Sequence, residues 1–352
     1  MVDVTIPPGA KYSAEEVLAL PNVKSKASYI EDLRTKGYCV IPSILPKERC
    51  DGYVDDALTW LEDFKLGFKR DDNKTWKTEC LPIGHKGGLY NQYCCAHEDW
   101  VWRVRCEPAV LECFKELWGT DELLVSFDAV NVTFPYGEHG RTDEAWVDPW
   151  PHQDQDPHKP VFQLAQGIVA LSESGPDDGG LCVMVGSHLL HQQFFAESGG
   201  VDESRISALN SYHFNAKEAD WYRAHGCHDI KYLQFSFADA KEQIECPQGS
   251  LIMWDSRLMH WNRMPTGDRT RVAVYVCYQP VADATPEQVK RKAEVYQNRW
   301  VATHWPALND VRAMYRGGPQ RDGKPDPADR KRPIREPVEN DTLLKLAGVK
   351  AY

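Results

Sequence analysis

The sequence contains no long hydrophobic run, no C-x-x-C pair and no block of charge of one sign. No stretch approaches the roughly 18 consecutive apolar residues of a membrane-spanning helix, and the start lacks the basic and apolar regions of a secretory signal. The 11 cysteines are scattered, which favours buried, reduced thiols over a disulfide framework. We therefore expect a cytoplasmic protein with no membrane partner.

Basic residues are too few for a nucleic-acid-binding surface. The 41 Lys and Arg residues are outnumbered by 52 Asp and Glu residues, so the formal net charge is -11 and a polyphosphate would be repelled. The chain still has 42% hydrophobic residues over 352 positions, enough for a sizeable core. Its 12 Trp and 15 Tyr residues exceed the needs of packing and suit a site with aromatic walls for a small molecule.

Short apolar runs, separated by turns that contain Gly and Pro, dominate the middle of the chain. The expected strands are residues 38–44, 123–135, 162–171, 181–185, 250–255 and 271–278. Helical periodicity follows Pro46 and covers 108–118, and capping-box patterns at Ser28 and Thr285 begin two further helices. Strands between terminal helices predict a mainly β sandwich or barrel with helices packed outside, rather than alternating α/β.

Composition divides the chain into three parts. Residues 1–24 form a polar N-terminal extension, residues 25–280 form the main domain, and residues 281–352 carry a helix and an extended tail. A polar insertion at about 190–245 interrupts the strand series and contains a helix near 216–224. An insertion of this length is either a lid over a binding site or surface decoration.

The segment His152-Gln153-Asp154 carries the clearest chemical signal. On an extended strand, residues two apart point to the same face, so His152 and Asp154 can bind one metal ion. A third ligand is expected from a later strand, and His260 follows the apolar run 250–255. Two imidazoles and one carboxylate on one face of iron leave three positions open for a co-substrate and O2. These three residues are therefore the predicted metal ligands.

Two other clusters contain ligand-type residues in a less suitable pattern. His97 and Asp99 repeat the H-x-D spacing, but they lie in a stretch that looks helical, where residues two apart diverge. His225, Cys227 and His228 resemble half of a zinc site, without a second half at standard spacing. We expect structural roles for both clusters.

Arg271 follows His260 by eleven residues and opens the expected strand 271–278. An arginine at the mouth of a barrel strand can pair with a carboxylate through two parallel hydrogen bonds. Arg269 is the alternative for this role, and we favour Arg271 on spacing. His188 follows a glycine and a serine, which is more typical of a turn than of a ligand.

These motifs resemble the phytanoyl-CoA dioxygenase-like family of Fe(II)/2-oxoglutarate-dependent oxygenases over about residues 37–280. The matching pieces are Gly37 to Pro42, His152 to Gln155, Gly180-Leu181, Gly186-Ser187-His188, Gly249-Ser250, His260 and Arg271. The resemblance implies a double-stranded β-helix (jelly-roll) core and Fe(II) as the metal, with 2-oxoglutarate and O2 as co-substrates. It also implies that Arg271 and Asn131 bind 2-oxoglutarate. The chain departs from the family at Val185, where proline is usual, and at Leu181, where some members have threonine.

The implied reaction is oxidation of a small organic metabolite, by hydroxylation, desaturation or cyclisation, with release of succinate and CO2. Asp154 argues against halogenation, because related halogenases lack this carboxylate. No clear basic cluster is visible that could hold the phosphates of a CoA thioester, which favours a smaller substrate such as an amino-acid derivative. A divalent-metal hydrolase or isomerase on the same core, and a non-catalytic binding member of the family, are the alternatives.

Overall fold

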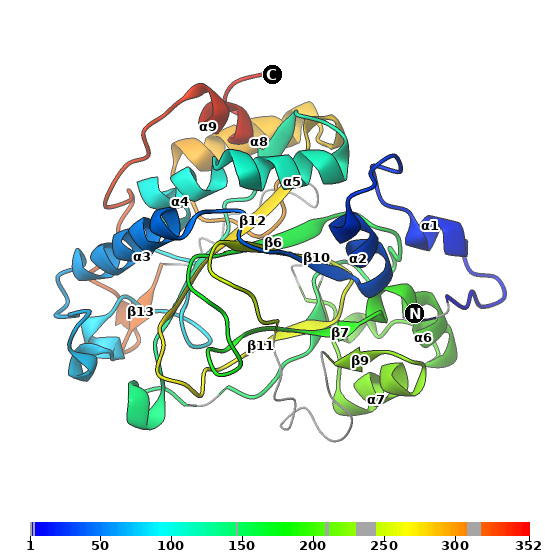
Figure 1. The fold of residues 1–352 in the computed structure, drawn as a ribbon, viewed down its shortest axis with the longest axis horizontal. Helices are drawn as coiled ribbons and strands as arrows, with labels where there is room; N and C mark the ends of the chain where they lie inside the picture. The colour runs from blue at the N-terminus through cyan, green and yellow to red at the C-terminus, as the bar shows by residue number, and fades with distance from the viewer. Residues whose placement is uncertain (1, 3, 146, 208–210, 230–243, 308–317) are drawn as a thin grey trace.

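The computed structural model describes residues 2, 4–145, 147–207, 211–229, 244–307 and 318–352. Two antiparallel sheets face each other in the centre of the molecule (Figure 1). The larger sheet has the order β1-β10-β6-β12-β4-β2, with β3 also paired to β12, and the smaller sheet has the order β8-β5-β11-β7-β9. The strands are β1 (Tyr38–Ile41), β2 (Leu89–Tyr90), β3 (Leu123–Val125), β4 (Val130–Thr133), β5 (His152–Gln153), β6 (Ala165–Ala170), β7 (Gly180–Val185), β8 (Tyr212–His213), β9 (His228–Asp229), β10 (Ser250–Asp255), β11 (His260–Arg263), β12 (Arg271–Pro280), β13 (Gln320–Arg321) and β14 (Lys324–Pro325).

The central strands are buried on both faces, and side-chain alternation decides what each face contacts. In β10, Ile252 and Trp254 belong to a cluster that residues of both sheets share, including Val183 of β7. Leu251 and Met253, which alternate with them, belong to the core between the larger sheet and the helices. The alternation therefore creates two apolar layers, one between the sheets and one under the helices.

Helices cover the outer faces of both sheets (Figure 1). Helices α3, α4, α5, α8 and α9 lie over the larger sheet, and α6 and α7 pack against the smaller one. None of the described helices is long and apolar enough to cross a membrane. The helices are α1 (Ala14–Leu18), α2 (Ser28–Lys36), α3 (Lys47–Glu62), α4 (Asp99–Arg105), α5 (Pro108–Trp118), α6 (His191–Glu197), α7 (Ala216–Ala224), α8 (Pro286–Gln297) and α9 (Asp341–Leu346).

Some expected boundaries are confirmed and others are wrong. The strand 250–255 and the helix 108–118 occur as expected, and Thr285 caps α8. The expected strand 123–135 is two strands, β3 and β4. Ala27, not Ser28, is the N-cap of α2, and it makes no side-chain hydrogen bond. Among the described residues, helix (32%) also exceeds strand (19%), so the expectation of a mainly β chain is too strong.

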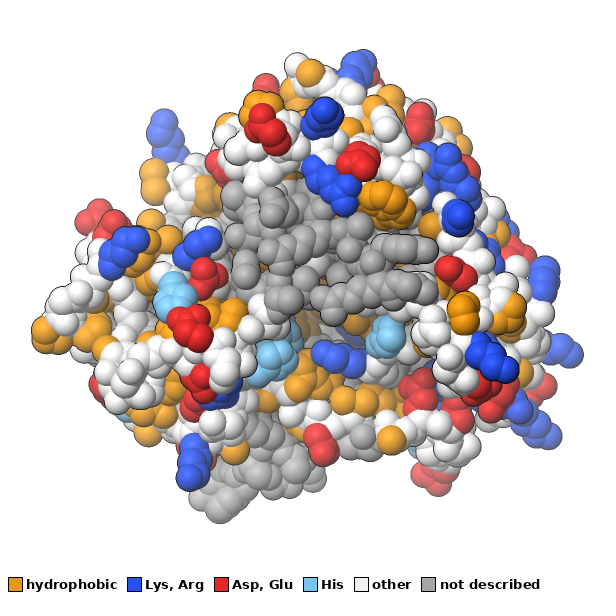
Figure 2. Space-filling model, turned by 180° about the vertical axis from the view of Figure 1, so that it is seen from behind, with side chains coloured by type: hydrophobic (Ala, Val, Ile, Leu, Met, Phe, Trp, Pro, Cys, Tyr) orange, Lys and Arg blue, Asp and Glu red, His pale blue; other side chains and the backbone are white. Residues whose placement is uncertain are grey.

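The described part of the 190–245 insertion contains α6, β8, α7 and β9, and the helix expected at 216–224 is confirmed as α7. Residues 208–210 and 230–243 of this insertion lie outside the described residues. Strand β8 pairs with β5, which places His213 opposite His152. The insertion therefore extends the smaller sheet next to the predicted metal ligand. Over the face shown in Figure 2, acidic and basic side chains are interspersed.

Candidate metal centre

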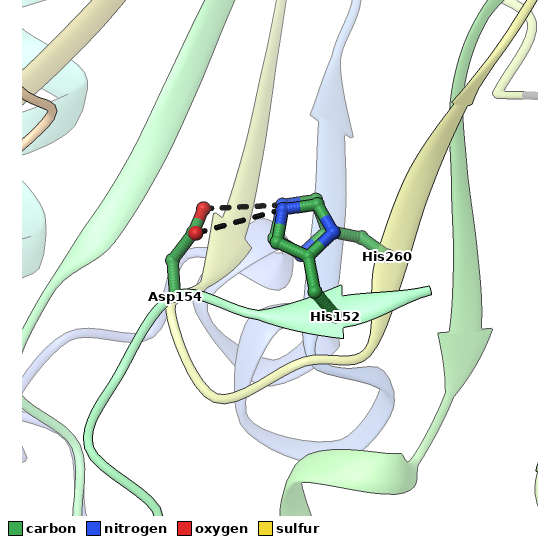
Figure 3. Close-up of side chains that lie close together, drawn as sticks. All are labelled: His152, Asp154 and His260. Carbon is green, nitrogen blue, oxygen red and sulfur yellow. Dashed lines mark ion pairs between the residues drawn. The ribbon is translucent and has the colours of Figure 1, made fainter. Parts of the chain in front are cut away.

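His152, Asp154 and His260 come together on the smaller sheet (Figure 3). His152 lies in β5 and His260 opens β11, and the two residues are direct cross-strand partners. One ligand atom from each of the three side chains lies within 4.8 Å of the others. Asp154 Oδ1 is 3.5 Å from His152 Nε2, and Asp154 Oδ2 is 3.3 Å from His260 Nε2. The carboxylate thus faces both imidazole rings.

Both imidazoles are oriented through their second nitrogen. Nδ1 of His152 is 3.0 Å from the carbonyl oxygen of Trp150, and Nδ1 of His260 is 2.9 Å from that of Leu258. A carbonyl oxygen only accepts, so each Nδ1 carries the proton and each Nε2 keeps its lone pair. The two lone pairs are therefore available on the side of Asp154, which is the arrangement that a divalent metal ion requires.

The protonation states of His152 and Asp154 also suit a metal ion. Burial, together with the neighbouring His260, lowers the pKa of the His152 imidazole to about 3. Burial raises the pKa of Asp154, but His152, His304 and His260 lower it more, so the net pKa is well below the usual value. At neutral pH, His152 is therefore neutral and Asp154 is ionised, as metal ligation demands.

The Asp154 carboxylate, which follows β5, is held by residues from other segments of the chain. Gln166, in β6 of the larger sheet, donates from Nε2 to Asp154 Oδ2 at 2.9 Å. The Asp154 backbone N–H donates to the carbonyl oxygen of Ser256 at 2.9 Å. A hydrogen-bonded carboxylate keeps its orientation when a metal ion binds, and such outer partners tune affinity. Gln166 also links the triad to the facing sheet.

Arg271 opens β12 and is 5% exposed. Its Nη1 donates to Asn131 Oδ1 at 2.9 Å, and Thr133 Oγ1 donates to the same oxygen at 2.9 Å. Among the described residues, no carboxylate forms an ion pair with Arg271, whereas Arg269 is paired with Asp178 at 2.6 Å. A buried cation without a protein anion can recognise a carboxylate ligand. The geometry therefore favours Arg271 over Arg269 for this role.

Three residues that sequence reasoning missed also surround the centre. Lys86 Nζ lies 4.2 Å from the centre of the Trp150 ring, and the His213 ring stacks on His152 with 5.4 Å between centroids. His304 lowers the pKa of the triad carboxylate, and its own Nε2 is buried with no hydrogen-bond partner among the described residues. No local pattern identifies these residues, because strand pairing and the C-terminal segment bring them to the site.

The less suitable clusters do not join the centre. His97 is buried, with Nε2 2.8 Å from the carbonyl oxygen of Trp300, and Asp99 begins α4. The His225 ring stacks on Trp221. Neither cluster forms a group of three or more metal-binding side chains in the part of the chain that the structure describes. His188 is likewise buried in a turn.

Two facing antiparallel sheets that carry two imidazoles and one carboxylate are typical of mononuclear non-haem metal enzymes. The family model described as phytanoyl-CoA dioxygenase (PhyH) matches residues 33–273. A relative from Aspergillus versicolor, "Ava biosynthesis cluster protein O", is 34% identical over 276 residues, 78% of this chain and 85% of the relative. The chain belongs to the phytanoyl-CoA dioxygenase family, and it is an Fe(II)/2-oxoglutarate-dependent oxygenase. The family and cofactors expected from the sequence are thereby confirmed.

Solved structures with similar folds are more distant. The epimerase SnoN, in complex with Fe3+, alpha ketoglutarate and nogalamycin RO, is 14% identical with a TM-score of 0.49, and the match covers 90% of this chain and 96% of SnoN. EctD from S. alaskensis, with 2-oxoglutarate and 5-hydroxyectoine, is 15% identical with a TM-score of 0.47, and the match covers 86% of this chain and 91% of EctD. Likenesses at this level assign no substrate to this chain.

Proposed function

We propose that this oxygenase binds Fe(II) through His152, Asp154 and His260 and oxidises a small organic metabolite by hydroxylation, desaturation or cyclisation. The observation that carries the proposal is the triad, in which two imidazole Nε2 atoms lie 3.5 and 3.3 Å from the oxygens of one carboxylate. In this proposal, the two sheets form the double-stranded β-helix of an oxygenase domain at 25–280. Residues 1–24 and 281–352 are additions to that domain.

When bound, Fe(II) supplies activation of O2 coupled to the oxidative decarboxylation of 2-oxoglutarate to succinate and CO2, with one oxygen atom passing to the substrate in a hydroxylation. The residues of the chain bind and orient 2-oxoglutarate. Arg271 holds the far carboxylate of 2-oxoglutarate through charge-assisted hydrogen bonds. Asn131 fixes the guanidinium by accepting from Nη1, and Thr133 fixes the Asn131 amide in turn. Burial of these groups keeps water from competing for them.

Two observations support a small metabolite as the substrate. The relative with 34% identity is named for a biosynthesis cluster. Next to the triad, the Trp150 ring offers an aromatic wall beneath the Lys86 ammonium group. An apolar wall with a few polar groups is the usual lining of a small-molecule site.

Succinate formation from 2-oxoglutarate tests this proposal. Wild-type protein should form succinate only with Fe(II) and O2 present, and Asp154→Ala should abolish it. Asp156→Ala is the matched control, because Asp156 is the next carboxylate on the same segment and its side chain accepts a hydrogen bond from the His158 backbone N–H instead of facing the two imidazoles. Oxygen-independent turnover of a substrate would instead support the hydrolase or isomerase alternative. Equal succinate formation by wild type and Asp154→Ala would contradict the assigned ligands.

A further inference from the structure

A cavity of about 660 Å3 lies between the loop that follows β2 and two C-terminal segments, 297–301 and 329–332. Cavities of this size hold small organic ligands. Among the described residues, four cations line it, namely Arg299 and the consecutive residues Arg330, Lys331 and Arg332, against a single carboxylate, Asp329. The fold brings Arg299 beside the 330–332 run, a cluster that the sequence alone does not make evident. In a chain of net charge -11, this cluster is a local exception.

The four cations differ in whether the protein already neutralises them. Arg299 pairs with Glu336 at 2.8 Å, and Arg332 lies 3.5 Å from the other oxygen of the same carboxylate. Arg330 and Lys331 form no ion pair with any described residue, and the Arg330 guanidinium lies 4.0 Å from the centre of an aromatic ring instead. Two cations of the cavity are therefore left for a ligand.

Three buried polar atoms of the cavity wall also have no partner among the described residues. They are Arg330 Nε, Asn91 Oδ1 and Gln92 Oε1. Burial lowers the pKa of the Arg330 guanidinium. Buried polar groups are normally hydrogen-bonded, so each exception requires an explanation. An anionic ligand in the cavity would supply a partner for the Arg330 guanidinium.

The backbone around the cavity is strained. Tyr93, Cys94 and Arg299 have φ values of 56°, 58° and 56°, the left-handed region that residues other than glycine rarely adopt. Tyr93 is held there by a 2.7 Å hydrogen bond from its hydroxyl to Asp326 Oδ2. Strain of this kind gathers where the surrounding structure organises a site in advance for its ligand.

The cavity wall leads toward the triad through the residues that follow His85. His85 lines the cavity, and the Nζ atom of the next residue, Lys86, lies 4.2 Å from the centre of the Trp150 ring. The carbonyl oxygen of Trp150 is 3.0 Å from Nδ1 of His152. We infer that this cavity holds the anionic group, a carboxylate or a phosphate ester, of the oxygenase's small-molecule substrate. This inference rests on the proposed function, because it takes the triad as the reacting centre.

Paired probes test the inference. A panel of N-acylated amino acids is compared with the corresponding carboxamides, and phenyl phosphate is compared with phenol, by calorimetry on wild-type protein. An anion held by Arg330 and Lys331 should bind at least about tenfold more tightly than its neutral partner. A preference for the N-acylated amino acids identifies the anionic group as a carboxylate, and a preference for phenyl phosphate identifies it as a phosphate ester. If no anion of either arm binds more tightly than its neutral partner, the inference is overturned.

Charge-removing variants distinguish anion binding at this cavity from non-specific attraction by the positive charge of the surface. Arg330→Gln and Lys331→Gln should each reduce the preference for the anion, and Arg330→Lys should restore part of it, because lysine keeps the charge but loses the fork of donors. Arg332→Gln is the matched control, because Glu336 already pairs with this residue. An equal loss in Arg332→Gln and Lys331→Gln would show non-specific attraction and contradict the inference.

The visible absorption of the protein with Fe(II) and 2-oxoglutarate distinguishes failure of this inference from failure of the proposed function. The preferred anion should change that absorption in wild type and should not do so in Arg330→Gln. An anion that binds without changing the absorption overturns the assignment to the substrate. Absence of the absorption itself contradicts the proposed function, while calorimetry on the same protein still decides whether the cavity selects anions.

Discussion

Arg271→Gln should weaken 2-oxoglutarate binding more than any other single change outside the triad. Arg271 is 5% exposed, and no described carboxylate neutralises its guanidinium, so its charge is free for the ligand. Removing one partner from a buried charge pair costs about 3 kcal/mol. This cost corresponds to a roughly 150-fold weaker Kd for 2-oxoglutarate. The fold should survive, because Asn131 Oδ1 keeps the hydrogen bond from Thr133.

The assay is an anaerobic titration of 2-oxoglutarate into protein loaded with Fe(II), followed by visible absorption. Arg269→Gln is the control, because Arg269 is 47% exposed in its side chain and is paired with Glu173 and Asp178. Its Kd should stay within about threefold of wild type, as expected for a surface ion pair. Weaker binding in Arg269→Gln than in Arg271→Gln would refute the assignment of the carboxylate partner.

Three further predictions concern support of the fold and the site. Gly88→Ala should destabilise the protein by more than about 3 kcal/mol in urea unfolding, because φ is +136° and a Cβ atom would lie 2.4 Å from a β4 carbonyl oxygen. The control Gly137→Ala, at φ +62° with open space around the residue, should cost only about 1 kcal/mol. Equal losses of stability in the two variants would contradict this reasoning. Gln166→Leu removes the hydrogen bond to Asp154 and should weaken Fe(II) affinity by about 10- to 100-fold in metal titrations; unchanged affinity would show that the bond is dispensable. Burial lowers the pKa of His191 to about 3, whereas an unfolded histidine titrates near 6.5. Below pH 6.5 the unfolded state therefore takes up the proton first, and the free energy of unfolding should fall by about 2 kcal/mol between pH 7 and pH 5. If wild type and His191→Gln had the same pH profile, His191 would not be the source of this loss.

The triad could be predicted from the sequence because its geometry is mainly local. Alternation along an extended segment puts His152 and Asp154 on one face whatever the rest of the fold does. His260 needed one more step, a turn and an apolar strand that end just before it. The structure brings the three together as this reasoning requires. Arg271 could be predicted for the same reason, because it opens a strand whose apolar pattern is clear in the sequence.

The rest of the site depends on contacts between distant segments, which local patterns do not encode. Lys86 reaches the centre through a turn packed on β4, and His304 arrives from the C-terminal segment. The basic cavity needs Arg299 to pack beside a run more than thirty positions later in the chain. Helical content was underestimated because several helices are short, such as α6 with seven residues, and show little periodicity.

The most direct test of the account is the formation of a Fe(II)–2-oxoglutarate chelate at the triad. Metal-free protein is titrated anaerobically with Fe(II) and 2-oxoglutarate, and the weak metal-to-ligand charge-transfer band in the visible is recorded. The account predicts this band in wild type, its loss in His260→Ala, and its retention in His158→Ala, an exposed histidine paired with Glu203. Fe(II) binding without the band in wild type, or a band of full intensity in His260→Ala, would contradict the account.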